Sequence, residues 1–278
     1  MEVTFYPAPA KLNLFLHVLG RRAEGDYAGY HELQTVFRLI DRADRVGVAA
    51  RDDGEIRFSG VFGEENLCVR AARLLQKKTG SKKGCDLVLE KNIPVGGGMG
   101  GGSSDAATVL LVLNKLWHLQ IKKQDLLKIG LELGADVPFF LFGRNALGEG
   151  IGERLQALDL PPAWYLVLTP QVSVSTKETF ANALTSGGKR LTIPPFFPGQ
   201  GKNDLEPVVA GRHPEVAACL AWLKSRCPQA RMTGSGAGVF AELQSESEAQ
   251  ALEAQLPETM RGFVAQGLGQ HPLHDLTN

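Results

Sequence analysis

A run of glycines is the part of this 278-residue chain best suited to chemistry. Six of the seven residues from Gly96 to Gly102 are glycine, and Ser103-Ser104-Asp105 follow directly. Glycines let the backbone adopt positive φ angles and approach a ligand closely. A helix that begins after such a loop directs its free N–H groups and positive dipole end at the loop. The segment predicts an anion cradle suited to a polyphosphate, with Ser103, Ser104 or Asp105 capping the helix.

Other interpretations of this run fit less well. The dinucleotide fingerprint G-x-G-x-x-G matches Gly96, Gly98 and Gly101, but a glycine run satisfies almost any glycine pattern. The acidic residue expected about 20 residues later, at the end of a second strand, is missing. A Walker A loop requires Gly-Lys-Ser/Thr, whereas Gly102 is followed by Ser103. A flexible linker is rarely flanked by a buried strand and an amphipathic helix, so a phosphate-binding loop remains the best interpretation.

Two charged residues stand in apolar surroundings. Asp136 follows Gly134 and precedes an apolar run, which predicts a partly buried carboxylate. Lys11 is flanked by alanine and leucine. Buried charged groups are usually paired or functional, and a carboxylate with an ammonium could act on a hydroxyl beside a bound polyphosphate. The alternatives are a helix-end cap for Asp136 and an exposed strand-end position for Lys11.

Alternating patterns of strands and helices must position these residues. Apolar–polar alternation predicts strands at 12–20, 31–40, 46–49, 55–58, 86–90, 164–169, 231–232, 239–243 and 262–265. Helical spacing predicts helices at 65–78, after Asp105 to about 117, and at 123–133, 214–225 and 246–256. This mixture gives an α+β or α/β class. Two prolines in 158–162 mark a break, and the Gly- and Pro-rich stretch 185–202 predicts a loop.

Composition excludes several classes of protein. Lys plus Arg and Asp plus Glu both total 30, and this balance argues against a nucleic-acid partner. The four cysteines lack C-x-x-C spacing and the six histidines lack metal-ligand spacing, so no zinc site is expected. No segment reads as a signal peptide, and no apolar run approaches the roughly 18 residues of a membrane span. We therefore expect a soluble, cytoplasmic protein with no membrane partner.

Three blocks of the sequence resemble the GHMP kinase superfamily. They are the phosphate-loop block from Pro94 to Ala107, the N-terminal block at 7–14 and the glycine motif Thr233–Gly238. The blocks occur in the family's order and span nearly the whole chain. The resemblance implies an α+β, two-domain GHMP kinase fold, with a ribosomal S5 domain 2-like N-terminal domain and a ferredoxin-like C-terminal domain. It divides the chain into an ATP-binding domain, 1–159, and a substrate-binding domain, 160–278.

Two further blocks narrow the resemblance to one branch of the superfamily. Gly29–Thr35 and Leu133–Phe139 resemble kinases that act on a cytidine diphosphate-linked methylerythritol in the non-mevalonate isoprenoid pathway. The branch implies transfer of the γ-phosphate of ATP, with Mg²⁺, to the 2-hydroxyl of that small molecule. It also implies that the protein acts in a bacterial cytoplasm as a monomer or weak homodimer. Two alternatives are another GHMP kinase, for homoserine, mevalonate or a sugar, and a catalytically silent nucleotide-binding regulator. Gly29–Thr35 argues against the first, and Lys11 with Asp136 against the second.

The resemblance also implies a role for individual residues. Lys11 and Asp136 would be the catalytic pair, with Asp136 as the base, and no residue is assigned to a metal. ATP would contact Pro94, Val95, Gly96, Gly97, Gly98, Met99, Gly100, Gly101, Gly102, Ser103, Ser104, Asn66 and Lys91, the last two near the adenine. The acceptor would contact Asn13, Tyr30, His31, Thr176 and Phe180, with its cytosine between Tyr30 and Phe180. Thr176 could instead be a helix N-cap. The chain departs from the family in a longer Ala23–Ala28 segment and in Met99, where leucine is usual.

Overall fold

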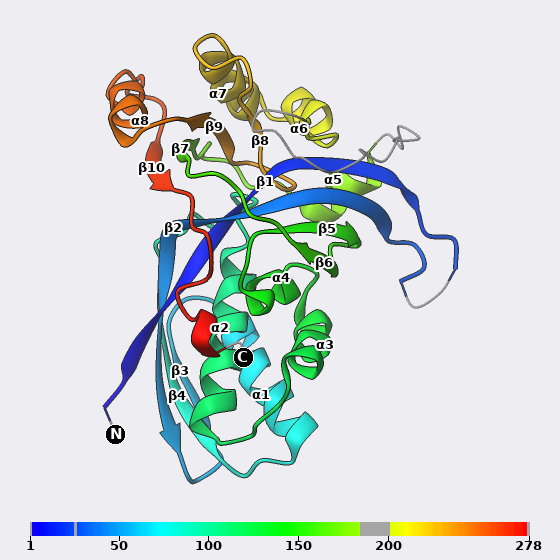
Figure 1. Ribbon diagram of the computed structural model, residues 1–278, viewed down its shortest axis with the longest axis vertical. Helices are drawn as coiled ribbons and strands as arrows, with labels where there is room; N and C mark the ends of the chain where they lie inside the picture. The colour runs from blue at the N-terminus through cyan, green and yellow to red at the C-terminus, as the bar shows by residue number, and fades with distance from the viewer. Residues whose placement is uncertain (1, 25–26, 184–200, 277–278) are drawn as a thin grey trace.

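The described residues, 2–24, 27–183 and 201–276 of a computed structural model, form two sheets with helices packed against each (Figure 1). The first sheet has the order β3-β4-β2-β5-β6, with β1 paired along β2. Its strands are β1 (Thr4–Arg21), β2 (His31–Arg51), β3 (Ile56–Ser59), β4 (Gly84–Glu90), β5 (Ala146–Gly150) and β6 (Arg154–Ala157). Only β3 and β4 pair in parallel among these strands.

Helices cover one face of the first sheet (Figure 1). They are α1 (Leu67–Thr79), α2 (Gly101–Leu116), α3 (Lys123–Leu133) and α4 (Val137–Phe142), with a 3-10 turn η1 (Gly63–Glu65) before α1. Helix α2 packs against β1 and β2 and also touches the other three helices. Every residue from 104 to 113 is therefore buried, well beyond a single apolar stripe. These contacts fix the position of α2, and with it the position of its N-terminus.

The second sheet is antiparallel, with the order β10-β7-β9-β8. Its strands are β7 (Trp164–Leu168), β8 (Arg231–Met232), β9 (Val239–Leu243) and β10 (Gly262–Gln266). The remaining helices are α5 (Thr176–Ala181), α6 (Glu206–Arg212), α7 (Pro214–Lys224), α8 (Glu246–Glu253) and the 3-10 turn η2 (His274–Leu276). Helices between β7 and β8 and between β9 and β10 complete a β-α-β-β-α-β arrangement. The predicted α+β class and ferredoxin-like second layer are confirmed.

The two layers share a hydrophobic core. One buried cluster fills the first layer and a second fills the other. A third joins them, because Leu12 and Phe15 of β1 pack in one cluster with Tyr165 and Phe240 of the second sheet. The chain also returns to the first layer after β10, where Leu268 N–H donates to the Leu39 carbonyl at 2.8 Å. Strand β1 is thus fixed from both sides along the segment that carries the candidate catalytic lysine.

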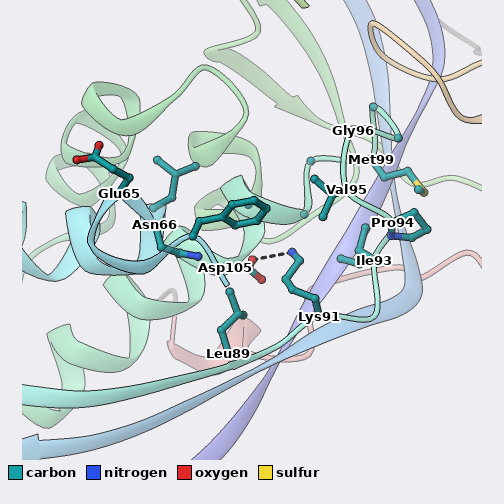
Figure 2. Close-up of a pocket in the computed structure, with 17 residues that line it drawn as sticks. Glu65, Asn66, Leu89, Lys91, Ile93, Pro94, Val95, Gly96, Met99 and Asp105 are labelled. Carbon is teal, nitrogen blue, oxygen red and sulfur yellow. Dashed lines mark hydrogen bonds and ion pairs between the residues drawn. The ribbon is translucent and has the colours of Figure 1, made fainter. Parts of the chain in front are cut away.

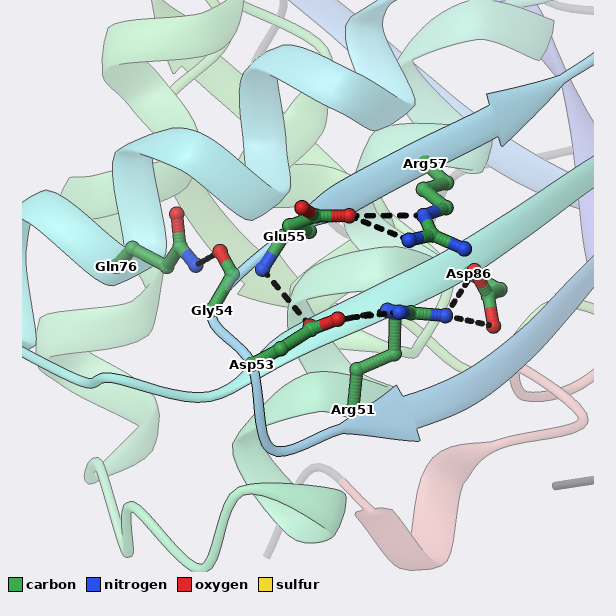
Figure 3. Close-up of polar contacts among 7 residues, drawn as sticks. All are labelled: Arg51, Asp53, Gly54, Glu55, Arg57, Gln76 and Asp86. Carbon is green, nitrogen blue, oxygen red and sulfur yellow. Dashed lines mark hydrogen bonds and ion pairs between the residues drawn. The ribbon is translucent and has the colours of Figure 1, made fainter.

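A polar network lies at one end of the first sheet, around the turn between β2 and β3 (Figure 3). At the end of β2, Arg51 donates to both carboxylate oxygens of Asp86 on β4, at 3.1 and 3.2 Å, and also to Asp53. In the same turn, the Gly54 carbonyl accepts a 2.9 Å hydrogen bond from Gln76 of α1. The network ties the β2–β3 turn to β4 and to α1. Arg51 and Asp53 are partly or largely exposed, so their pair adds little stability by itself.

The predicted elements differ from the structure in extent and in number. Strands β1 and β2 run far beyond the predicted 12–20 and 31–40, because they pair with each other over almost their whole length, and the strand predicted separately at 46–49 is part of β2. The sequence patterns missed α4, α5, α6, β5 and β6. Helix α4 is Val-Pro-Phe-Phe-Leu-Phe, which has no polar face to give a helical period. Most of the predicted loop 185–202 lies outside the described residues.

Candidate active site

The glycine run forms a tight loop between β4 and α2. Gly96, Gly98 and Gly100 have φ angles of 76°, 70° and 71°, in the region that favours glycine. Gly100 is the N-cap of α2, and the helix begins at Gly101 with no side-chain cap. The predicted cap by Ser103, Ser104 or Asp105 is therefore wrong, because these residues already lie inside the helix. The N–H groups at the start of α2 remain directed at the loop, as an anion site requires.

The motif Thr233–Gly238 packs directly against this loop. The Ala237 N–H donates to the Gly96 carbonyl at 2.9 Å, and the Gly238 N–H donates to the Gly97 carbonyl at 3.1 Å. A Cβ atom at Gly98 would lie only 2.4 Å from the Thr233 carbonyl oxygen. Two segments almost 140 residues apart thus hold each other by backbone contacts that only glycine allows. This contact explains why the chain needs glycine at both places.

Lys11 lies beneath the loop and faces Asp136. The Lys11 residue is 2% exposed, and its ammonium donates to the Gly98 carbonyl at 2.8 Å and to the Asn13 side chain. Its nitrogen lies 3.6 Å from a carboxylate oxygen of Asp136, whose side chain is 35% exposed. Burial lowers the pKa of Lys11, and the Asp136 carboxylate opposes that fall. The exposed strand-end alternative for Lys11 is wrong, and Asp136 makes no side-chain cap contact at α4.

A short relay of hydrogen bonds fixes the orientation of Asn13. Its Oδ1 accepts from Lys11, and its Nδ2 donates to the Thr35 hydroxyl at 2.8 Å. The Thr35 hydroxyl in turn donates to the Phe15 carbonyl at 2.5 Å. The Asn13 backbone N–H donates to the Thr233 hydroxyl at 2.9 Å. Sequence reasoning did not single out Thr35 or Thr233 as site residues, although both lie in the resembling blocks.

Two cavities meet at the glycine loop. The smaller, about 260 Å³, is lined by the whole loop, the start of α2, Asn66 and Lys91 (Figure 2). The larger, about 960 Å³, is lined by Lys11, Asp136 and Ser103 among other residues. Gly98 and Gly100 line both cavities. A donor bound in the smaller cavity could therefore present a terminal phosphate to an acceptor bound in the larger one.

The residues predicted near the adenine line the smaller cavity, but their polar atoms are already bonded. The Asn66 Oδ1 accepts from the Cys68 N–H at 2.8 Å, and its Nδ2 donates to the Val61 carbonyl at 2.9 Å. Asn66 is thus the N-cap of α1. Lys91 is paired with two buried carboxylates, Asp44 and Asp105. Pro94, Val95, Gly96, Gly97, Met99, Gly101 and Gly102 line the same cavity.

Aromatic residues predicted to bind the acceptor gather in the larger cavity. Tyr30 is 57% exposed there, and the His31 and Phe180 rings lie 5.4 Å apart. Burial, and then the charge of Arg21, lower the pKa of His31, so its imidazole is neutral and can both donate and accept. Thr176 contacts the Ser235 hydroxyl at 2.8 Å. Ser175, whose hydroxyl accepts from the Glu178 N–H, is the cap of α5, so the N-cap alternative for Thr176 is wrong.

Three further predictions concern Ser104, a metal site and a membrane span. Ser104 is fully buried inside α2 and does not line either cavity. Among the residues that the structure describes, no three His, Cys, Asp or Glu side chains are close enough to hold a metal ion. None of the described helices is both long and apolar enough to cross a membrane.

Family comparisons agree with this geometry. Residues 66–144 match the GHMP kinases N terminal domain, and residues 194–262 match the GHMP kinases C terminal family. A Nitrosospira multiformis protein named 4-diphosphocytidyl-2-C-methyl-D-erythritol kinase is 56% identical, and the match covers 97% of this chain and 92% of that protein. The kinase of the same name from Thiobacillus denitrificans is 55% identical, with 97% of both chains covered.

Solved structures extend the comparison. A crystal structure of 4-(cytidine 5'-diphospho)-2C-methyl-D-erythritol kinase has a TM-score of 0.82 and 35% identity, over 96% of this chain and all of that one. The Methanococcus jannaschii mevalonate kinase has a TM-score of 0.67 at 14% identity, over 96% of this chain and 99% of that one, so it shares the fold. The chain belongs to the GHMP kinases, within the family of 4-diphosphocytidyl-2-C-methyl-D-erythritol kinases.

Proposed function

We propose that this protein transfers the γ-phosphate of ATP to the 2-hydroxyl of 4-diphosphocytidyl-2-C-methyl-D-erythritol. The observation that carries the proposal is the position of Lys11 and Asp136 where the nucleotide and acceptor cavities meet. The names of the relatives favour this acceptor over homoserine, mevalonate or a sugar. The larger cavity, about 960 Å³ and lined by Tyr30, Phe180 and Asp136 among other residues, suits an elongated nucleotide-linked polyol.

The roles proposed for the catalytic pair follow from their contacts. Asp136 is half-buried and lines the acceptor cavity, so it can accept the proton of the attacking hydroxyl. Lys11 holds a carbonyl of the glycine loop and faces Asp136, so it can orient the nucleophile and stabilise charge on the transferring group. The free N–H groups at the start of α2 would hold the phosphates. Positioning and electrostatics together supply the catalysis that phosphoryl transfer needs.

Acceptor recognition is proposed to rest on three aromatic side chains that line the larger cavity, those of Tyr30, His31 and Phe180. Tyr30 and Phe180 would enclose the cytosine ring by stacking. The neutral His31 imidazole would hydrogen-bond to the edge of the base. Asn13 would contact the acceptor near the reacting hydroxyl, since it lines the cavity beside Lys11. Thr176 lines the same cavity and would contact the acceptor from α5.

Mg²⁺ is part of the proposal, and the donor set of the chain fits its usual mode of binding. No three acidic, His or Cys side chains gather among the described residues, and we propose that the ion is held mainly by nucleotide phosphates and water. Such an ion would neutralise phosphate charge. Among the described residues that line the acceptor cavity, Asp136 is the only carboxylate, and it is proposed to act on the hydroxyl.

The proposed setting is a bacterial cytoplasm, where the protein acts as a monomer or weak homodimer without nucleic acid. The formal net charge of zero supports the last point. Light scattering of the purified protein tests the oligomeric state: a stable assembly of three or more copies would overturn that part of the proposal.

A coupled assay of ADP release tests the function. The protein should release ADP from ATP and Mg²⁺ with the diphosphocytidyl methylerythritol acceptor, and not with homoserine, mevalonate or galactose. A folded protein that binds ATP but releases ADP only with one of the other acceptors would show that the substrate assignment is wrong. A protein that binds ATP and turns over none of them would favour the silent regulator.

A further inference from the structure

A buried cluster of two carboxylates and one ammonium forms part of the nucleotide cavity. The Lys91 ammonium donates to Asp105 Oδ2 at 2.9 Å (Figure 2). It also donates to Asp44. Asp44 is fully buried and Asp105 is 1% exposed. With both acids ionised, the cluster would carry a net charge of −1 beside a site that receives a polyanion. Buried charge without a partner is unfavourable, so a net charge of −1 in this cluster would be destabilising.

The two acids differ in the hydrogen bonds they accept. Asp44 Oδ1 accepts the backbone N–H groups of Asn92 at 2.5 Å and Ile93 at 2.8 Å, and its Oδ2 accepts from Lys91. Asp105 accepts from Lys91 and also faces the Asp44 carboxyl group, to which its neutral form could donate, while its buried Oδ1 has no partner among the hydrogen bonds of the described structure. Asp44 therefore accepts three hydrogen bonds that stabilise its ionised form. Asp105 is the acid whose neutral form would be better satisfied, since a protonated carboxyl can donate.

The groups around Asp105 support its neutral form. Burial raises the pKa of Asp105 to about 7, with Asp44 adding to the rise and Lys91 opposing it. On α1, Cys68 faces the cluster, and burial raises the pKa of its thiol, so it stays uncharged. Glu65, from η1, lines the same cavity and adds no positive charge. Among the described residues that line this cavity, Lys91 is the only cation.

We propose that Asp105 is a proton-linked residue of the nucleotide cavity, and that nucleotide binding takes up one proton from solvent onto its carboxyl group. The proposal rests on the nucleotide-binding part of the proposed function. A bound polyphosphate brings negative charge to the start of α2, and this charge stabilises the neutral acid over the carboxylate. After uptake, Lys91 pairs with Asp44 alone, and the cluster is neutral. This linkage makes nucleotide affinity depend on pH without any change at Lys11 or Asp136.

The sign of the effect follows from linkage. Above about pH 7 the free protein holds Asp105 largely as a carboxylate, so binding must add the proton and affinity falls as pH rises. The fall approaches about tenfold per pH unit. Asp105→Asn keeps the size of the side chain and is neutral at every pH. Its affinity should therefore stay level over the same range, apart from the titration of the nucleotide itself.

Calorimetric titration of the full-length protein with a non-hydrolysable ATP analogue tests the proposal. Titrations at about pH 8 in two buffers of different ionisation enthalpy give the number of protons taken up. The wild type should take up about half to one proton more than Asp105→Asn. The exposed Asp125→Asn on α3 serves as the matched control and should behave as the wild type. Equal proton uptake by wild type and Asp105→Asn would overturn the proposal.

A measurement on the wild type alone guards against a variant that fails to fold. The infrared difference spectrum between free and nucleotide-bound protein at about pH 8 should gain a protonated-carboxyl band. Absence of this band, with binding confirmed, would contradict the proposal. Neither experiment uses the acceptor, so loss of the proton link is distinguishable from failure of the kinase assignment. If no nucleotide binds at all, both fail together.

Discussion

The Lys11 ammonium donates a 2.8 Å hydrogen bond to the carbonyl oxygen of Gly98. One side chain thereby joins the glycine loop to the carboxylate proposed as the base, since the same nitrogen lies 3.6 Å from Asp136. Lys11 therefore contacts both the loop and the proposed base. A change at Asp136 should therefore affect phosphoryl transfer more than nucleotide binding, since Asp136 lines only the larger cavity.

Asp136→Asn should remove the base and leave the nucleotide site intact. We expect kcat to fall by about 10²–10⁴-fold, the usual contribution of a positioned general base. The Kd for ATP should be unchanged, because Asp136 does not line the smaller cavity. Steady-state kinetics and calorimetry check the two quantities. A variant with near-normal kcat would show that Asp136 has only a structural role at the start of α4.

The alkaline limit of activity should lie below the ordinary range of a lysine. Burial lowers the pKa of Lys11, so its ammonium, and with it kcat, is lost as pH rises through that lowered value. The Asp136 charge opposes the lowering. In Asp136→Asn the residual activity should therefore fall at a lower pH than in the wild type. If kcat falls at the same alkaline pH in the wild type and in Asp136→Asn, Lys11 is not the titrating group.

Thr35→Val should misalign Asn13 without disturbing ATP binding. The hydroxyl of Thr35 accepts from Asn13 Nδ2, which leaves Asn13 Oδ1 to face Lys11. Leaving a buried amide donor unsatisfied costs roughly 1–3 kcal/mol, so we expect kcat to fall about tenfold or more. Thr35→Ser keeps the hydroxyl and should restore most of the activity. Equal losses in both variants would point to packing by the Thr35 methyl group instead.

Gly98→Ala should damage the loop far more than Gly96→Ala. Both positions have positive φ, so each alanine carries a backbone strain of about 1–2 kcal/mol. Only at Gly98 would the new Cβ atom meet backbone oxygens, of Thr233 at 2.4 Å and of Gly236 at 2.9 Å. Nothing lies within 4 Å at Gly96. Nucleotide affinity and Tm should both drop further for Gly98→Ala, and similar effects in the two variants would contradict the packed loop.

Tyr30→Leu and Phe62→Leu should separate the two cavities. Both aromatic residues are exposed, at 57% and 64%, but Tyr30 lines the larger cavity and Phe62 the smaller. Loss of ring stacking should raise the KM for the acceptor about tenfold in Tyr30→Leu and leave the KM for ATP unchanged. The reverse pattern is expected for Phe62→Leu. If both variants raise the same KM, the assignment of the cavities is wrong.

Sequence reasoning located the loop and the catalytic candidates because local patterns carry them. The glycine run predicts a turn of the kind that binds phosphate. Lys11 and Asp136 are charged residues in apolar segments. Their proximity came from the family resemblance, since 125 positions separate them. No local signal shows that β1 carries Lys11 beneath the loop, because that depends on its pairing with β2.

Other parts of the site depend on long-range contacts that no spacing reveals. Lys91 meets Asp44 across 47 positions, and Asn13 meets Thr35 across 22. Asn66 was predicted near the adenine, and its side chain is in fact bonded as the cap of α1. The cap could have been anticipated, since Asn directly before an apolar helical period is a strong N-cap signal. The buried acid pair could not.

Identification of the phosphorylated product tests the central claim most directly. Wild-type protein, incubated with ATP, Mg²⁺ and 4-diphosphocytidyl-2-C-methyl-D-erythritol, should yield equal amounts of ADP and of an acceptor with a new phosphate on the 2-hydroxyl, as phosphorus NMR would show. Asp136→Asn at the same concentration should yield almost none while still binding ATP. ADP without phosphorylated acceptor, phosphate on another hydroxyl, or undiminished product from Asp136→Asn would contradict the account.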